Sequence, residues 1–161
     1  MNEPPEFLRT EVWHPMTVHF PIVLLIVATL FKGIAVTFRK QTFAISGSVL
    51  LYLGVIGAWL AVYTGTLADA VVSRDICDPT VLSTHENNAW LATWLFTGAM
   101  GVDLLYSLVR RFRTRAVQAL LLVVLVIGSG VLAYVGHLGA QLVYQQAAGV
   151  YVPSEDCSEF R

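Results

Sequence analysis

The sequence predicts an all-α protein that crosses a membrane four times. Hydrophobic residues make up 56% of the 161 residues, charged residues make up 13%, and the mean hydropathy is +0.66. These values are typical of membrane proteins rather than of soluble domains. Four apolar segments are long enough to cross a hydrocarbon core, which takes roughly 20 helical residues. We therefore expect a single transmembrane domain over residues 1–161, folded as an up-down-up-down four-helix bundle.

The four expected spans are joined by connections of different length. The spans cover about residues 17–38, 44–68, 87–109 and 116–146. The connections at 39–43 and 110–115 are short, so the helices that they join should be antiparallel neighbours. The connection at 69–86 is longer and polar. At about 1.5 Å per residue, the fourth helix is long enough for its end to stand clear of the bilayer.

Local signals predict where the first and third helices begin. His14 precedes Pro15, and the residue before a proline disfavours helix, so we expect His14 just outside the first helix. Ser83 and Glu86 fit a capping box, which would begin the third helix there and hold His85 in its first turn. The charged residues before the first span are Glu3, Glu6 and Glu11 against a single Arg9, whereas a signal peptide begins with basic residues, so we expect a retained first helix.

Basic residues gather on one side of the expected bundle. Those on the side of the two short connections are Lys32, Arg39, Lys40, Arg110, Arg111, Arg113 and Arg115. Those on the other side are Arg9, Arg74 and Arg161. By the positive-inside rule the first side faces the cytoplasm. We therefore expect both termini on the periplasmic side of a bacterial inner membrane.

All four histidines fall at the periplasmic edge of this bundle. They are His14, His19, His85 and His137. Neutral imidazole is a common ligand of haem iron and of transition metals, so imidazoles from three helices indicate a bound cofactor. His14 and His19 are five residues apart, roughly 140° around a helix, so one helical face cannot present both. They would serve two centres, or one would be a ligand and the other a neighbouring contact, or His14 would fold back from irregular backbone.

Small residues form a stripe along two of the expected helices. The second helix carries Gly54, Ala58, Ala61, Gly65 and Ala68, and the fourth carries Ser129, Ala133, Gly136 and Ala140. Such stripes usually allow close helix packing in lipid. The alternative is that Gly65 and Gly136, near the level of the histidines, make room for a flat macrocycle.

Four motifs around the histidines carry a family resemblance. They are His14-Pro15-Met16-Thr17-Val18-His19-Phe20-Pro21, Ala61-Val62-Tyr63-Thr64-Gly65, the His85 helix start and Gly136-His137. With these motifs, nearly the whole chain resembles an uncharacterised family of small four-span bacterial membrane proteins. Its general plan is also similar to that of four-helix b-type cytochromes. The resemblance implies a histidine-ligated redox cofactor and no catalytic residue.

The leading hypothesis is a membrane b-type cytochrome with one or two haems. We expect His19 and His137 to form one axial pair, with His14 and His85 available for a second haem nearer the water. Groups able to meet the propionates are Arg9, Arg74, Asn87, Asn88 and Gln141. Covalent c-type attachment is excluded because the chain has no Cys-x-x-Cys-His motif. The protein would then be an electron-transfer subunit of a larger redox complex, with a quinone or a soluble cytochrome c as candidate partners.

Two other functions fit the same residues. Imidazole also suits copper, zinc and iron, so the four histidines with Glu86 or Asp69 would close a mononuclear or dinuclear non-haem site. The protein would otherwise be a structural subunit of a respiratory or photosynthetic membrane complex. No phosphate loop, nucleophile triad, nucleic-acid patch or internal repeat is evident in the sequence.

Two residue pairs complete the expectations. Cys77 and Cys157 both fall on the outer side, where an oxidising compartment favours a disulfide. Lys32 and Asp103 are charges well inside the expected spans, where an ionisable group normally has a partner. We expect a salt bridge between the first and third helices. The alternative is that Asp103 is a protonatable residue of a quinone site.

Overall fold

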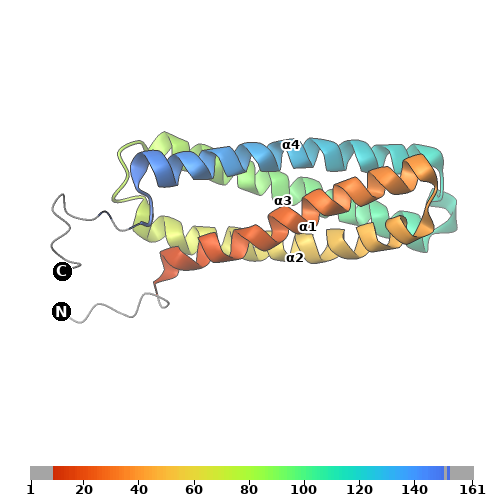
Figure 1. Ribbon diagram of the computed structural model, residues 1–161, viewed down its shortest axis with the longest axis horizontal. Helices are drawn as coiled ribbons and strands as arrows, with labels where there is room; N and C mark the ends of the chain where they lie inside the picture. The colour runs from red at the N-terminus through yellow and green to blue at the C-terminus, as the bar shows by residue number, and fades with distance from the viewer. Residues whose placement is uncertain (1–8, 151, 153–161) are drawn as a thin grey trace.

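The protein folds as the expected bundle of four long antiparallel helices (Figure 1). The computed structural model describes residues 9–150 and 152. The helices are α1 (Thr10–Phe38), α2 (Gln41–Val72), α3 (Pro79–Leu108) and α4 (Arg115–Gln146), and a short 3₁₀ helix, η2 (Arg110–Phe112), precedes α4. Within the described residues, these four α-helices are long and apolar enough to cross a membrane.

The first helix begins earlier than predicted. α1 starts at Thr10, so His14 and Pro15 lie in its second turn and not in irregular chain outside it. A proline near a helix start removes only one backbone hydrogen bond, the one to the carbonyl four residues earlier, which here belongs to Glu11. The steric preference of the residue before proline is therefore overridden by the helix around it.

The third helix also begins earlier, with a different cap. The Asp78 carboxylate accepts a 2.9 Å hydrogen bond from the backbone N–H of Thr80, and Pro79 occupies the first helical position, which suits proline. The capping box predicted from Ser83 is wrong, because its hydroxyl donates to the carbonyl of Thr80 inside the helix. His85 consequently lies in the second turn of α3, and the connection from α2 shrinks to residues 73–78.

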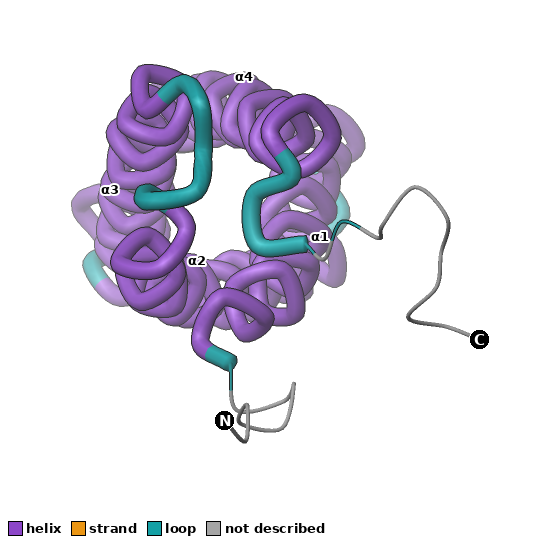
Figure 2. Tube along the Cα trace, turned by 90° about the vertical axis from the view of Figure 1, so that its left-hand side faces the viewer, coloured by secondary structure: helices purple, strands orange, loops and turns teal. Residues whose placement is uncertain are grey.

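The helices are arranged as two hairpins. α1 packs most extensively on α2, and α3 on α4, whereas α1 and α4 share fewer contacts. α1 begins and α4 ends at the same end of the bundle, called here the terminal end, from which Figure 2 views the ring of helices. α1 runs obliquely, close to α4 at the opposite end and away from it at the terminal end (Figure 1).

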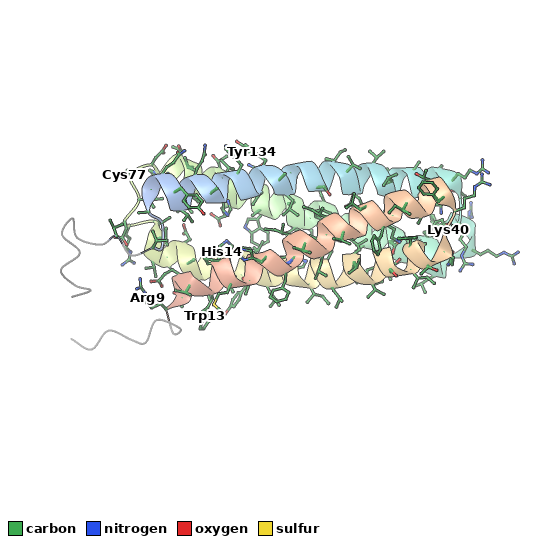
Figure 3. All side chains as sticks on the ribbon, viewed as in Figure 1. Arg9, Trp13, His14, Lys40, Cys77 and Tyr134 are labelled. Carbon is green, nitrogen blue, oxygen red and sulfur yellow. The ribbon has the colours of Figure 1, made fainter. Side chains whose placement is uncertain are left out.

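The end opposite the terminal end is basic and contains the two short connections that hold Arg39, Lys40 and Arg110–Arg113. Figure 3 shows Lys40 there, with Arg9 and Cys77 at the terminal end. Between the two ends, the buried Nζ of Lys32 donates to Asp103, as the sequence predicts. Asp103 also accepts a 2.9 Å hydrogen bond from the Tyr52 hydroxyl. α1, α2 and α3 are therefore joined by one buried polar cluster.

Candidate functional site

Two histidines face each other inside the terminal end of the bundle. The ring centroids of His14 and His85 are 6.2 Å apart and the ring planes are at 90°. His14 is the labelled histidine of α1 in Figure 3. Nδ1 of His14 lies 2.9 Å from the carbonyl oxygen of Ala61, and Nδ1 of His85 lies 3.0 Å from that of Val135. A carbonyl only accepts, so Nδ1 donates in both rings, and the lone pair of each neutral ring is on Nε2.

Each of these rings lies against a glycine of the partner helix. A β-carbon added to Gly65 of α2 would lie 3.1 Å from Cε1 of His14, and one added to Gly139 of α4 would lie 3.3 Å from Cε1 of His85. Gly65 therefore makes room for a histidine ring. Gly136, the second glycine predicted to make such room, is exposed, and an added β-carbon there would have no atom within 4 Å.

A cavity of about 500 Å³ lies between the helices, and both rings line it. Its walls are mainly apolar, with Leu25, Phe96, Leu132 and Val135 among the lining residues. The volume is in the usual range for small-molecule and cofactor sites. We call this space the histidine cavity.

Polar residues line the histidine cavity as well. They are Glu11, Thr66, Asp69, Thr93 and Glu86, besides the histidines. Glu11 is buried and accepts a 2.7 Å hydrogen bond from Arg9, which brings one cation next to a cavity-lining residue. Exposed residues of all four helices line the cavity as well, among them His19 on α1 and Gly136 on α4.

The side chains of His19 and His137, the predicted axial pair, are both exposed. Nδ1 of His19 donates to the carbonyl of Pro15 over 2.6 Å, and Nε2 of His137 lies 3.3 Å from Nε2 of Gln141. The rotation around α1 that separates His14 from His19 turns His14 inward and His19 outward, as their spacing requires.

The family model described as a predicted membrane protein (DUF2231) matches residues 11–151, which include α2, α3, α4, all but the first residue of α1, and both cavity histidines. The chain belongs to this family. Neither the curated proteins nor the solved structures contain a match. The DUF2231 description and the four candidate spans identify a multi-pass membrane protein, and the description gives no activity.

The side chains predicted to meet propionates do not line the histidine cavity of this DUF2231 protein. Arg74 and Asn87 are exposed, and the Asn88 amide donates to the carbonyl of Thr84 over 2.8 Å. Arg9 pairs with Glu11, which lines the cavity. The sequence predicts how far along the bundle axis these amides and Arg74 lie. It does not predict the side of the helix to which they point.

The described part of the chain forms no group of three or more His, Cys, Asp or Glu side chains that could hold a metal ion. The predicted non-haem site of four histidines with Glu86 or Asp69 is therefore not assembled there. Cys77 is exposed in the connection between α2 and α3. Its predicted disulfide partner, Cys157, lies outside the described residues.

The two predicted small-residue stripes have different outcomes. The stripe on α2 packs closely on α1, since a β-carbon on Gly54 would lie 2.6 Å from Leu25. On α4, Ala133, Gly136 and Ala140 are exposed, and Gly136 and Ala140 line the histidine cavity. The face of α4 that packs on α3 carries Gly128 and Gly139 instead.

Sequence reasoning missed three parts of the site in this DUF2231 protein: the carbonyls of Ala61 and Val135, and Gly139. One signal for them was available. A glycine follows each carbonyl residue after four positions, at Gly65 and at Gly139, so the two helices carry the same spacing.

Proposed function

We propose that the protein binds one haem b between His14 and His85 and serves as an electron-transfer subunit of a membrane redox complex. The observation that carries the proposal is the separation of the two rings. Two imidazoles that bind one metal from opposite sides, each at about 2.0 Å, place their centroids roughly 6 Å apart. The observed separation is 6.2 Å.

The number of protein ligands favours haem over a non-haem metal. Zinc sites generally use three or four protein ligands. Among the described residues, His14 and His85 have no third His, Cys, Asp or Glu close enough to complete such a set. A haem brings four ring nitrogens of its own and takes two axial ligands from the protein. The size and the apolar walls of the histidine cavity suit the same ligand.

The protein's contribution would be to hold and tune the two ligands. The carbonyls of Ala61 and Val135 fix the tautomer and orientation of the rings and increase the basicity of Nε2. Arg9, which pairs with the cavity-lining Glu11, would meet a propionate at the terminal end. When bound, haem supplies reversible one-electron transfer.

The proposal includes the orientation and the partners predicted from the sequence. The basic end would face the cytoplasm of a bacterial inner membrane, and the histidine cavity the periplasmic side. A soluble cytochrome c or a neighbouring subunit would approach the terminal end. A quinone would approach from the bilayer at the exposed His19, which lines the histidine cavity.

The test compares four single histidine variants purified from haem-replete cells. We expect the wild-type protein to show a Soret band and, after dithionite reduction, an α band of b type, with one haem per chain by pyridine haemochromogen assay. His14→Ala and His85→Ala should each lose this spectrum. His19→Ala and His137→Ala are the matched controls and should keep it.

Two outcomes would contradict the proposal. Folded His14→Ala or His85→Ala protein that retains the wild-type spectrum would show that the ligands lie elsewhere. Folded wild-type protein without a Soret band would rule out haem binding. Metal analysis would then distinguish a copper, zinc or iron protein from a structural subunit. Circular dichroism of each variant establishes that it is folded.

A further inference from the structure

The two hairpins place matching residues at a constant offset along the chain, although the sequence shows no evident internal repeat. Lys32 of α1 and Asp103 of α3 are 71 residues apart, and so are His14 and His85. The same offset relates two pairs of core residues, Leu25 with Phe96 and Ala28 with Ala99. α1 and α3 therefore turn matching positions towards the centre of the bundle.

α2 and α4 match in the same way, at an offset of 74 residues between Gly65 and Gly139. A β-carbon on Gly54 would lie 2.6 Å from Leu25, and one on its counterpart Gly128 would lie 3.2 Å from Phe96. Most residues that line the histidine cavity form pairs at these two offsets. An approximate two-fold axis therefore runs along the bundle and through the cavity, as in membrane proteins built from parallel repeats.

The repeat includes the contacts that hold the histidine rings. In each hairpin one helix supplies the histidine, and the other supplies a carbonyl and, four residues later, a glycine. The first set is His14, Ala61 and Gly65, and the second set is His85, Val135 and Gly139. Their hydrogen bonds are 2.9 and 3.0 Å long. Two copies of one holding arrangement thus fix the two rings across the axis.

The glycines are needed because the rings approach the helices so closely. A methyl group at Gly65 or Gly139 would lie 3.1 or 3.3 Å from Cε1 of the ring. The best separation of two carbon atoms is about 3.5–4.0 Å, so the ring would have to move away from the helix. Such a movement would weaken the hydrogen bond at Nδ1 and change the 90° angle between the planes.

We propose that Gly65 and Gly139 are positioning residues that hold the two axial imidazoles with their planes at right angles. This inference rests on the proposed haem. The relative orientation of axial imidazole planes determines how the iron d orbitals are split, and ligand geometry is one means by which a protein tunes haem. Perpendicular planes give ferric low-spin haem a strongly anisotropic EPR signal with one dominant large g value. Parallel planes give a rhombic spectrum with three resolved features.

The first test measures haem in Gly65→Ala and Gly139→Ala. We expect the wild-type protein to give the strongly anisotropic signal. Each variant should bind haem roughly ten- to hundred-fold more weakly, the usual effect of losing an outer contact to a ligand, and should shift towards a rhombic signal. Gly98→Ala and Gly130→Ala are the controls, because an added β-carbon at either position has no atom within 4 Å. A rhombic wild-type spectrum, or variants identical to these controls, would overturn the inference.

The second test uses haem-free protein in detergent micelles with ¹⁵N-labelled histidine. Gly65→Ala should shift the ring nitrogens of His14 and leave those of His85 unchanged, and Gly139→Ala should do the reverse. If these shifts occur in protein that never shows a Soret band, the glycines position the rings and the proposed haem is wrong. If the haem spectrum is normal and the shifts are absent, the haem is right and the positioning role is wrong.

Discussion

At the scale of single residues, close packing of glycine against a large neighbour recurs along α2. Gly54 lies so close to Leu25 that an added β-carbon would approach a side-chain carbon to 2.6 Å. Leu25 is 1% exposed, so its side chain would have to shift within the core or towards the histidine cavity that it lines. Without a hydrophobic driving force between helices in lipid, such contacts provide much of the association energy. The hairpin of α1 and α2 therefore depends on the absence of a side chain at this position.

We expect Gly54→Ala to destabilise the folded protein by about 1–3 kcal/mol, the usual cost of overpacking a core. The measurement is the free energy of unfolding in mixed micelles of mild detergent and increasing dodecyl sulfate. Gly101→Ala is the control, because a β-carbon there has no atom within 4 Å, and it should change stability little. Equal stability of the two variants would show that α1 and α2 can separate slightly at no cost.

At the scale of elements, the ends of α3 and α4 are capped by different chemical groups. The N-cap of α3 is the Asp78 carboxylate, whereas the N-cap of α4 is the Thr114 hydroxyl, which accepts from the N–H of Val117 over 3.3 Å. Hydrogen bonds from the Thr80 hydroxyl and N–H hold the pKa of Asp78 below its ordinary value of 3.8. Only the first of these caps can respond to pH.

A lowered pKa means that the charged carboxylate stabilises the folded start of α3. This contribution is complete above the ordinary pKa and is lost as the pH falls through the lowered value. We therefore expect hydrogen exchange at the Thr80 amide to accelerate below about pH 4, beyond the pH dependence of intrinsic exchange. In Asp78→Ser this extra acceleration should disappear. The Val117 amide in the same sample is the control, and a parallel change there would indicate general unfolding.

Helix pairing also depends on the ion pair of Lys32 and Asp103. Removing one partner of a buried pair leaves a charge without compensation, which typically costs about 3–5 kcal/mol. We expect Lys32→Asp or Asp103→Lys alone to prevent stable folding or to lower the unfolding temperature sharply. The double exchange Lys32→Asp with Asp103→Lys should recover a large part of the loss, because these residues occupy matching positions of the two hairpins. Thermal unfolding by circular dichroism measures both effects, and no recovery would argue against equivalent positions.

At the scale of the whole molecule, charge separates the two ends of the bundle. The basic end holds the connections at 39–40 and 109–114, and the terminal end holds Cys77. Under the proposed orientation, which rests on the positive-inside rule, Cys77 would lie in the periplasm. We expect Cys77 to react with a membrane-impermeant maleimide in intact cells after reduction.

The matched variant carries Thr114→Cys in a chain whose own two cysteines are replaced by serine. This cysteine should be labelled only after the membrane is made permeable. The opposite labelling pattern would place the histidine cavity on the cytoplasmic side. If Cys77 is labelled to the same extent without reduction as after reduction, the predicted disulfide with Cys157 is absent.

The sequence by itself determined four spans, their alternating directions, the level of the histidines and the pairing of Lys32 with Asp103. These properties follow from hydropathy, from connection length and from the rise per residue, all of which are read along one helix at a time. Local rules were less reliable at helix starts. Pro15 and Ser83 suggested that α1 and α3 begin later along the chain than they do.

Only the tertiary structure decided which histidines meet. Successive residues of a helix point about 100° apart, so level along the axis does not tell which side chain faces the centre. The packing of α2 on α1 and of α4 on α3 fixes that rotation through Gly54 and Gly128. It turns His14 and His85 inward and leaves His19 and His137 on the surface, because a ring can enter only where the facing helix presents a glycine and a carbonyl.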